Sequence, residues 1–403
     1  MSAKIPRKEF VALMALLMSL PALSIDSVLP ALPLIKDQLH VDTDNHVQFI
    51  IGILFAGLTV GQLLFGSISD SFGRKPAIFI GLLIFAGGSI LSLFSTSFSM
   101  MLMGRFLQGL GAASARVVCV AIARDLYEGR DMAQIMSFIM AVFVFVPAIA
   151  PTIGQGIILA FDWRAIFILY LVMAAIITIW MHKRLPETLP KEKRSPFALR
   201  TIKRDFSIVV RNKVTLGYTI CAGLVFGGFI SYLSSAQQIF LDFYHVGELF
   251  PLYFGLSALS IGLASWVNGM IVQRYGMERL SRYALIVIIA ASSIFLLAFD
   301  LTDPNTPLAA YMTFAFVTFF CHGLLFGNLN TLAMEPMGQQ AGTASAVIGS
   351  LSTAISVCIG TVIGQLYNHT LIPLVLGFLC LSAVTLILHM WLRHYTTKMD
   401  VAA

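Results

Sequence analysis

Twelve long apolar runs constrain this chain more than any other feature of its sequence. They fall near residues 10–34, 47–68, 76–97, 100–123, 134–160, 164–182, 214–240, 249–272, 283–300, 308–333, 341–367 and 371–392. About 20 predominantly apolar residues are enough for one helix to cross a bilayer. The runs are continuous, whereas strands of a membrane barrel alternate apolar and polar residues. The sequence therefore predicts an all-α polytopic membrane protein with twelve transmembrane helices, the first a retained span and not a cleaved signal.

Composition excludes a soluble chain. Apolar residues make up 58% of the 403 residues and charged residues 11%, against about 25% charged in soluble domains. The net charge of +6 comes from basic residues between the apolar runs, so we expect no nucleic-acid partner. The five cysteines lie inside apolar runs without a CxxC pair, which favours packing roles and predicts no disulfide, metal or cofactor.

Lysine and arginine gather in the connections on one side of the predicted bundle, and Lys36 and Arg164 alone fall on the other. This asymmetry predicts that both termini lie in the cytoplasm. The longest polar stretch, residues 183–213, is basic and separates the two sets of six runs. We therefore predict an N-terminal six-helix half at 1–182, a water-exposed cytoplasmic linker at 183–213, and a C-terminal six-helix half at 214–403.

The two halves repeat a loop pattern. Gly66, Asp70 and Gly73 follow the second span, and Gly269, Gln273 and Gly276 follow the eighth with identical spacing. Both patterns occupy the equivalent loop of their own half, so a chance match is a poor explanation for the repeat. Two related halves with a site between them are the usual construction of a transporter.

Three charged residues interrupt spans of the first half: Asp26, Arg105 and Arg116. Each such charge costs about 2.5–3.5 kcal/mol at the centre of a helix on insertion scales, so it usually faces a cavity or a partner. Asp26 and Arg105 fall at similar depth, so they are candidates either for proton exchange or for a static pair between two helices. Arg116 follows Arg105 by almost three helical turns and shares its face. That face suits an anionic partner, the Asp26 carboxylate or a second structural pair.

Other unusual residues lie in later spans. Pro147, Pro151 and Gly154 follow Phe143 in the fifth span and predict a kinked helix with a close-packing face. In the second half, the candidates for a substrate cavity are Tyr232, Gln237, His322 and Asn328. For these, hydrogen-bonded packing and an interfacial belt remain alternatives.

These motifs resemble one family. The segment from Gly66 through Asp70, Gly73 and Arg74 to Pro76 resembles the loop signature of the major facilitator superfamily. Three further segments resemble its drug:proton antiporters: Asp26 to Pro33, Arg105 to Ala113, and Pro147 to Gly154. The run Arg124-Asp125-Leu126-Tyr127 is similar to the bicyclomycin/chloramphenicol-resistance (Bcr/CflA) subfamily. Ser71, Ala150 and Gln155 depart from the usual signatures.

The resemblance implies roles for individual residues. Asp26 would be the proton-coupling carboxylate, assisted by Arg105. Gly66, Asp70, Gly73 and Arg74 would form a cytoplasmic gate, with Arg74 pairing an acid such as Asp125. Pro147, Pro151 and Gly154 would form the antiporter motif. The candidates for the substrate cavity come from the residues themselves and not from the resemblance: Arg116, Phe143, Tyr232, Gln237, His322 and Asn328.

The sequence contains no Walker motif, HExxH or GxSxG element, so we expect no enzyme and no ATP hydrolysis. The predicted function is proton-coupled antiport that exports small amphipathic compounds across a bacterial inner membrane. The alternative is a proton-coupled or uniport carrier of one metabolite. The expected partners are a small-molecule substrate, protons and the lipid bilayer, with the chain active as a monomer.

Overall fold

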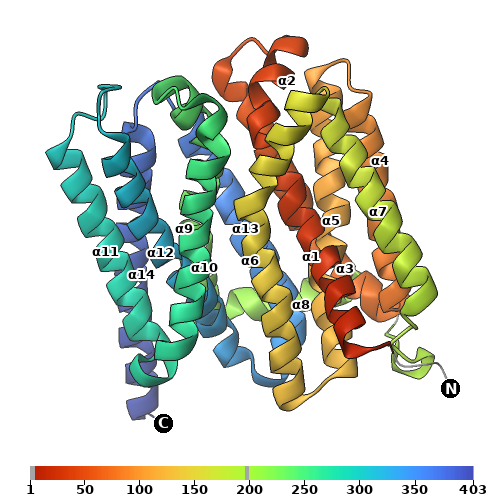
Figure 1. Cartoon of the computed structure of the whole chain (residues 1–403). Coiled ribbons are helices and arrows are strands. Elements are labelled where there is room, and N and C mark those ends of the chain that lie inside the picture. The colour runs from red at the N-terminus through yellow and green to blue at the C-terminus, as the bar shows by residue number, and fades with distance from the viewer. Residues whose placement is uncertain (1–4, 196–198, 403) are drawn as a thin grey trace. The chain divides into compact units, whose positions relative to one another are not determined.

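The computed structural model describes residues 5–195 and 199–402 as helices joined by short turns (Figure 1). The chain forms two compact units, Met1–Lys203 and Arg204–Ala403. The described residues contain 12 helices that are long and apolar enough to cross a membrane. The predicted all-α fold is therefore confirmed.

The first unit begins with α1 (Arg7–Asp26), the 3-10 turn η1 (Leu29–Ala31) and the short α2 (Leu32–Gln38). The remaining elements are η2 (Asp44–Gln48), α3 (Phe49–Phe72), α4 (Arg74–Leu93), α5 (Phe98–Leu126), α6 (Gly129–Ala160), α7 (Arg164–Arg184) and η3 (Lys191–Lys193). Pro30 lies inside η1, where the lost backbone donor ends the long helix. Asp26 is consequently the last residue of α1.

The amphipathic α8 (Leu199–Arg211) joins the two units. The second unit contains α9 (Lys213–Gln237), the π-helical turn η4 (Gln238–Phe243), η5 (Gly247–Leu249), α10 (Phe250–Tyr275), α11 (Met277–Ala298), α12 (Leu308–Met334), η6 (Glu335–Gln340), α13 (Ala341–Gln365) and α14 (Ile372–Ala402). Within the predicted linker 183–213, Leu185 and Leu189 are buried. These two side chains therefore pack against the protein.

The same helix pairings occur in both units. In the first, α3 and α4 pack on α5, and α1 packs on α6. In the second, α10 and α11 pack on α12, and α9 packs on α13. The turns that carry the repeated glycines also match, because Gly73 has φ 107° and Gly276 has φ 78°. Glycine reaches these angles without the steric penalty that other residues meet, which accounts for the repeated loop pattern.

Glycines set the distance between helices in the first unit. A Cβ on Gly57 of α3 would lie 2.1 Å from the Phe106 carbonyl oxygen of α5, and one on Gly109 would lie 1.9 Å from the Leu54 carbonyl oxygen. Backbones that approach this closely are typical of packing in lipid, where small residues at interfaces replace the hydrophobic drive. As a result, α5 is held firmly and so is the Arg105 that it carries.

Candidate functional site

Asp26 is buried at the end of α1, with 4% of its surface exposed. Its carboxylate makes no hydrogen bond and no ion pair within residues 5–195 and 199–402. Burying an ionised group without a partner costs several kcal/mol. An ionised Asp26 would therefore need water or a ligand as its partner.

Arg105, on α5, is fully buried and binds neutral acceptors. Its guanidinium donates to the Ser24 carbonyl oxygen of α1 at 2.9 Å and to the Ile50 carbonyl oxygen of α3 at 3.2 Å. A third bond runs to Gln108 Oε1 at 2.8 Å. Arg105 thus ties three helices together. Its contact with Ser24 lies two residues before Asp26 on α1. The side chains of Asp26 and Arg105 do not form the static pair.

Tyr170, on α7, belongs to the same cluster. Its hydroxyl lies 2.7 Å from Ser27 Oγ and is close enough to interact with the charges of both Arg105 and Asp26. Ser27 Oγ also bonds the Leu23 carbonyl oxygen at 2.7 Å. We name Asp26, Ser27, Arg105 and Tyr170 the Asp26 cluster.

The fifth span closes the cluster. Pro147 and Pro151 lie inside the continuous helix α6, so the predicted kink is not a break of the helix. A Cβ on Gly154 would lie 1.9 Å from the Ser27 carbonyl oxygen. Gly154 therefore lets α6 seat directly on the turn that follows Asp26.

A second cluster forms at the turn between α3 and α4, and we name it the Arg74 cluster. Arg74 donates through Nε to Asp125 Oδ2 of α5 at 2.8 Å, and its Nη1 bonds Ser69 Oγ at 2.9 Å and pairs with Asp70. The side chains of Arg74 and Asp125 are 10% and 19% exposed, so water screens this pair weakly, whereas Asp70 is half exposed. The pairing of Arg74 with Asp125 agrees with the sequence analysis, and Gly66 lies one turn before Asp70 on α3.

The segment after α7 is bound into the Arg74 cluster. Glu187 accepts hydrogen bonds from the backbone N–H groups of Arg74 at 2.9 Å and Lys75 at 3.1 Å. A carboxylate at the N-terminus of a helix is favoured by the unpaired N–H groups and the helix dipole. Thr188 Oγ1 donates to Asp125 Oδ2 at 3.0 Å, and the Ser195 N–H donates to the Asp70 carbonyl oxygen at 3.1 Å. We call residues 185–195 the strap.

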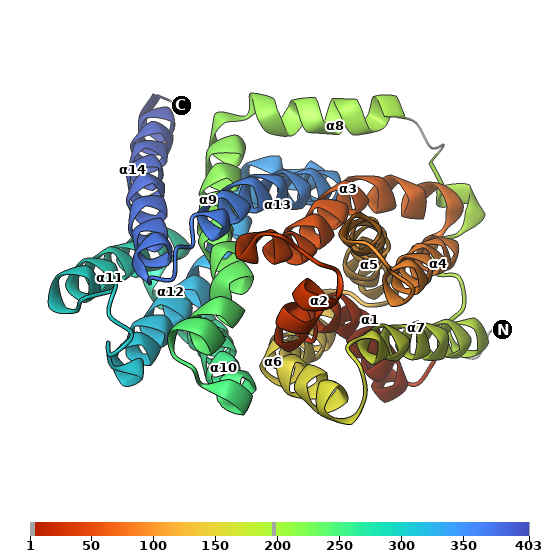
Figure 2. The same ribbon diagram turned by 90° about the horizontal axis from the view of Figure 1, so that it is seen from above.

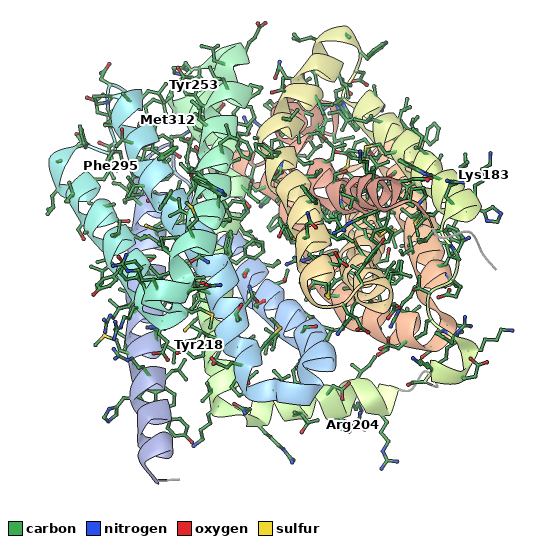
Figure 3. All side chains as sticks on the ribbon, turned by 60° about the horizontal axis from the view of Figure 1, so that its bottom comes forward. Lys183, Arg204, Tyr218, Tyr253, Phe295 and Met312 are labelled. Carbon is green, nitrogen blue, oxygen red and sulfur yellow. The ribbon has the colours of Figure 1, made fainter. Side chains whose placement is uncertain are left out.

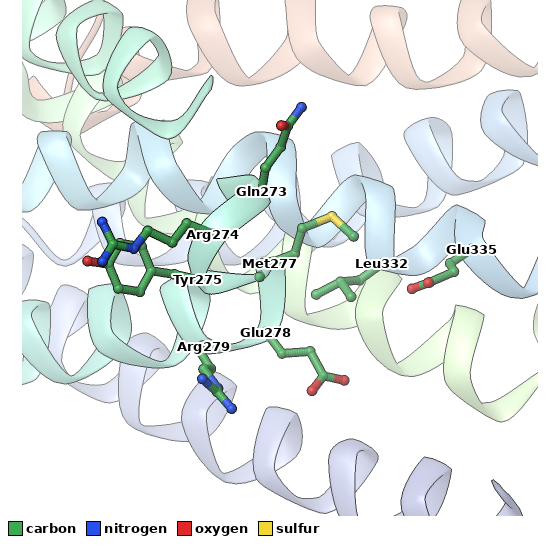
Figure 4. A pocket seen from close by; sticks show the side chains of 9 residues that line it. Gln273, Arg274, Tyr275, Met277, Glu278, Arg279, Leu332 and Glu335 are labelled. Atoms are coloured by element: carbon green, nitrogen blue, oxygen red, sulfur yellow. The ribbon is translucent and has the colours of Figure 1, made fainter. Parts of the chain in front are cut away.

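The second unit lacks these charges at the equivalent turn. Gln273 and Met277 stand in place of Asp70 and Arg74. An open depression of about 490 Å³ lies here, lined by residues that include Met277, Leu332 and Glu335. Figure 4 shows the Met277 side chain extending toward Leu332. The charged cluster thus breaks the symmetry of the repeat.

Aromatic side chains fill the second unit around two of the predicted cavity residues. Tyr232 is buried and stacks on Phe254, with ring centroids 5.8 Å apart. His322 is buried, its Nδ1 lies 2.8 Å from the Thr318 carbonyl oxygen, and its ring contacts Phe378 at 5.3 Å. The aromatic contacts continue to Phe295 and Tyr253 (Figure 3).

The remaining candidates differ in their surroundings. Asn328 and Asn268 exchange amide hydrogen bonds of 3.0 Å between α12 and α10. Gln237 is buried at the end of α9, and its side chain makes no hydrogen bond in the described part of the chain. Arg116 is exposed, with no hydrogen-bond or ion-pair partner among described residues. The side chain of Phe143 lies outside the described residues.

Sequence reasoning missed Ser24, Ser27, Tyr170 and Glu187. A tyrosine or serine in a membrane helix is common, because its hydroxyl can bond the backbone of its own helix. Glu187 lies in a polar stretch where a carboxylate needs no partner. The available signal for the serines and the tyrosine was the presence of hydroxyl groups in spans that accompany a span with a charged residue.

Comparison with known proteins identifies the family. The Major Facilitator Superfamily model matches residues 14–361. The chain belongs to the Major Facilitator Superfamily. The family resemblance predicted from the motifs is therefore confirmed, and membership makes the chain a multi-pass membrane transporter and not an enzyme.

Relatives of this transporter extend over most of its length. An uncharacterized MFS-type transporter YdgK of Bacillus subtilis is 30% identical over 91% of each chain. A bicyclomycin resistance protein homolog of Haemophilus influenzae is 29% identical over 91% of each chain. The multidrug resistance protein MdtL of Shewanella oneidensis is 28% identical, over 90% of this chain and 87% of MdtL.

Solved structures agree on the fold of this transporter. The human organic anion transporter MFSD10 has a TM-score of 0.70 at 19% identity, covering 96% of this chain and 99% of that one. The Escherichia coli xylose transporter XylE, in a partially occluded inward open conformation, has a TM-score of 0.74 at 12% identity, covering 96% and 98%.

Proposed function

We propose that this transporter exports small amphipathic molecules in exchange for protons across a bacterial inner membrane. The observation that carries the proposal is Asp26, a buried carboxyl group without a hydrogen-bond or ion-pair partner in the described chain. A group of this kind takes up a proton when it is sealed and releases one when water reaches it. Arg105, held by neutral acceptors that include the Ser24 carbonyl oxygen of α1, keeps a positive charge in the same cluster.

The class of substrate rests on the relatives. Proteins named for bicyclomycin resistance and multidrug resistance match this chain over about nine tenths of its length. We assign the same class of cargo, small amphipathic compounds, to this transporter. The exposed Arg116 favours a second candidate, a carrier of one anionic metabolite, because its guanidinium has no acidic partner among described residues.

We also propose that the Arg74 cluster is the cytoplasmic gate. It lies at the basic end of the first unit, which the distribution of lysine and arginine assigns to the cytoplasm. Ion pairs at this end have to break and re-form as the two halves of such a transporter rock. Both termini would then lie in the cytoplasm, with residues 183–213 on the same side.

The test is uphill transport in proteoliposomes with a controlled pH gradient. Bicyclomycin and the fluorescent cation ethidium serve as first probes, and a pH-sensitive dye reports proton movement. Wild-type protein should move a probe against its gradient and release protons in the opposite direction. Transport of a probe that ignores the pH gradient would favour the uniport carrier and contradict antiport.

Asp26 variants make this test specific. Asp26→Asn fixes a protonated-like side chain, so uphill transport should fall to the level of empty liposomes while probe binding persists. Asp26→Glu keeps the carboxylate and should retain part of the coupling. Proton-linked uphill transport by Asp26→Asn at the wild-type rate would remove Asp26 from the mechanism.

A further inference from the structure

The connecting helix α8 has two chemically distinct faces. Ile202, Phe206 and Val209 recur at the spacing of one apolar stripe. Arg200, Arg204 and Arg211 fall within a narrow arc well away from that stripe, given 3.6 residues per turn. All three arginines are exposed.

The apolar face of α8 is not fully covered by protein. Phe206 is 41% exposed and Val210 is 36% exposed, while Val209, close to the turn into α9, is buried. No other helix of the described chain packs along α8. A helix this short is marginal in water by itself, so its apolar face needs a further surface.

The position of α8 along the chain supplies that surface. Asn212 separates Arg211 from Lys213, the first residue of a membrane-spanning helix. Asn212 Oδ1 accepts from the N–H groups of Val214 and Thr215 at 3.1 and 3.0 Å, which fixes the start of α9. Figure 2 shows α8 running crosswise to α9. The end of α8 therefore lies at the depth where a span begins, the boundary between headgroups and water.

We propose that α8 lies in the membrane interface and binds the anionic headgroups of the bilayer that surrounds the transporter. Ile202, Phe206 and Val210 enter the boundary of the acyl chains. Arg200, Arg204 and Arg211 bind phosphate groups, and Figure 3 shows Arg204 on this helix. Basic residues of amphipathic helices add electrostatic attraction to the burial of apolar area. The joint between the two units is thereby anchored to lipid, independently of the cargo and of proton coupling.

The experiment measures hydrogen exchange of the full-length protein in nanodiscs of phosphatidylcholine, with and without phosphatidylglycerol. Amides of residues 199–211 should exchange severalfold more slowly with the anionic lipid at low salt, and the difference should shrink at high salt. Exchange in α9 should not change, which reports an intact fold.

Two matched variants decide the result. Arg204→Gln with Arg211→Gln removes two of the three arginines and should reduce the effect of the anionic lipid severalfold. Lys191→Gln with Lys193→Gln, an equal loss of charge on exposed residues of the same connection, should leave it intact. Equal protection in both nanodiscs, or in lipid-free detergent, would overturn the proposal and indicate a protein surface as the partner of α8. So would an undiminished lipid effect in the arginine variant.

Discussion

The groups around Asp26 are held by contacts that bypass its carboxylate. Arg105 binds the carbonyl oxygen of Ser24, two residues before Asp26, and Tyr170 binds Ser27, the residue after it. None of these bonds uses the carboxyl group of Asp26, so none of them depends directly on its proton. A change of protonation therefore meets an environment that is already organised, and little of the surrounding structure has to be rebuilt.

The hydroxyl of Tyr170 is the residue-scale test of this arrangement. Tyr170→Phe keeps the ring contacts with Phe85 and Phe167 but removes the bond to Ser27. The loss of about 1 kcal/mol of hydrogen bonding should lower proton-coupled transport roughly fivefold. Ser27→Ala removes the same bond, so the double variant should be no worse than either single variant. Additive losses in the transport assay would show that the two hydroxyl groups act separately.

At the scale of elements, α1 is enclosed by helices that approach it through small residues and hydroxyl groups. Gly154 of α6 meets the Ser27 carbonyl oxygen, while α7 reaches the same turn through Tyr170. The predicted antiporter motif thus meets the Asp26 cluster at Gly154, where a larger side chain would push α6 away from α1.

Two glycines of α6 make this a controlled comparison. Gly154→Ala places a Cβ 1.9 Å from the Ser27 carbonyl oxygen, so we expect a loss of about 1–3 kcal/mol of stability by overpacking and a clear loss of transport. Gly156→Ala meets nothing within 4 Å and should be neutral or slightly stabilising. Thermal unfolding and transport measured side by side check both. A Gly154→Ala protein with wild-type transport would separate α6 from coupling.

The strap predicts a second element-scale effect. Glu187→Ala removes the acceptor for the N–H groups of Arg74, Lys75 and Leu189. Hydrogen exchange of residues 185–195 should speed up severalfold. Transport should fall because the strap no longer holds the backbone of Arg74 through charge-assisted hydrogen bonds. Glu192→Ala, on an exposed residue of η3, is the control and should change neither. Unaltered exchange in Glu187→Ala would mean that other contacts hold the strap.

For the whole molecule, the sequence predicted the spans well, because continuous apolar runs leave few alternatives to membrane helices. The repeated glycines predicted the matching turns, since positive φ angles demand glycine. Similar depth suggested contact between Asp26 and Arg105, yet depth says nothing about the direction of a side chain. Arg105 found backbone carbonyl groups instead. Partners such as Tyr170 and Glu187 depend on tertiary packing, which a single sequence does not contain.

Orientation in the membrane is the prediction at this scale. Pro190→Cys and Pro304→Cys introduce thiols at two exposed positions, one in the strap and one between α11 and α12. A membrane-impermeant thiol reagent added to intact cells should label position 304 and miss position 190. The wild-type protein, whose native cysteines are free, gives the background. The reverse labelling would invert the assignment of both clusters.

Helix α1 is attached to α7 near both of its ends. Near its start, Glu9 accepts from Arg184 at 2.6 and 2.7 Å and from Trp180 at 3.0 Å. Near its end, Ser27 meets Tyr170. Because α1 is bonded to α7 near its start and near its end, it does not slide along α7. The carboxyl group of Asp26 therefore keeps one depth within its own unit. If Asp26 carries the proton, the membrane voltage, worth about 2.3 kcal/mol per unit charge per 100 mV, therefore acts on protons travelling through water to a stationary acid. The voltage dependence of transport then reports which aqueous path is open, and not a displacement of the residue itself.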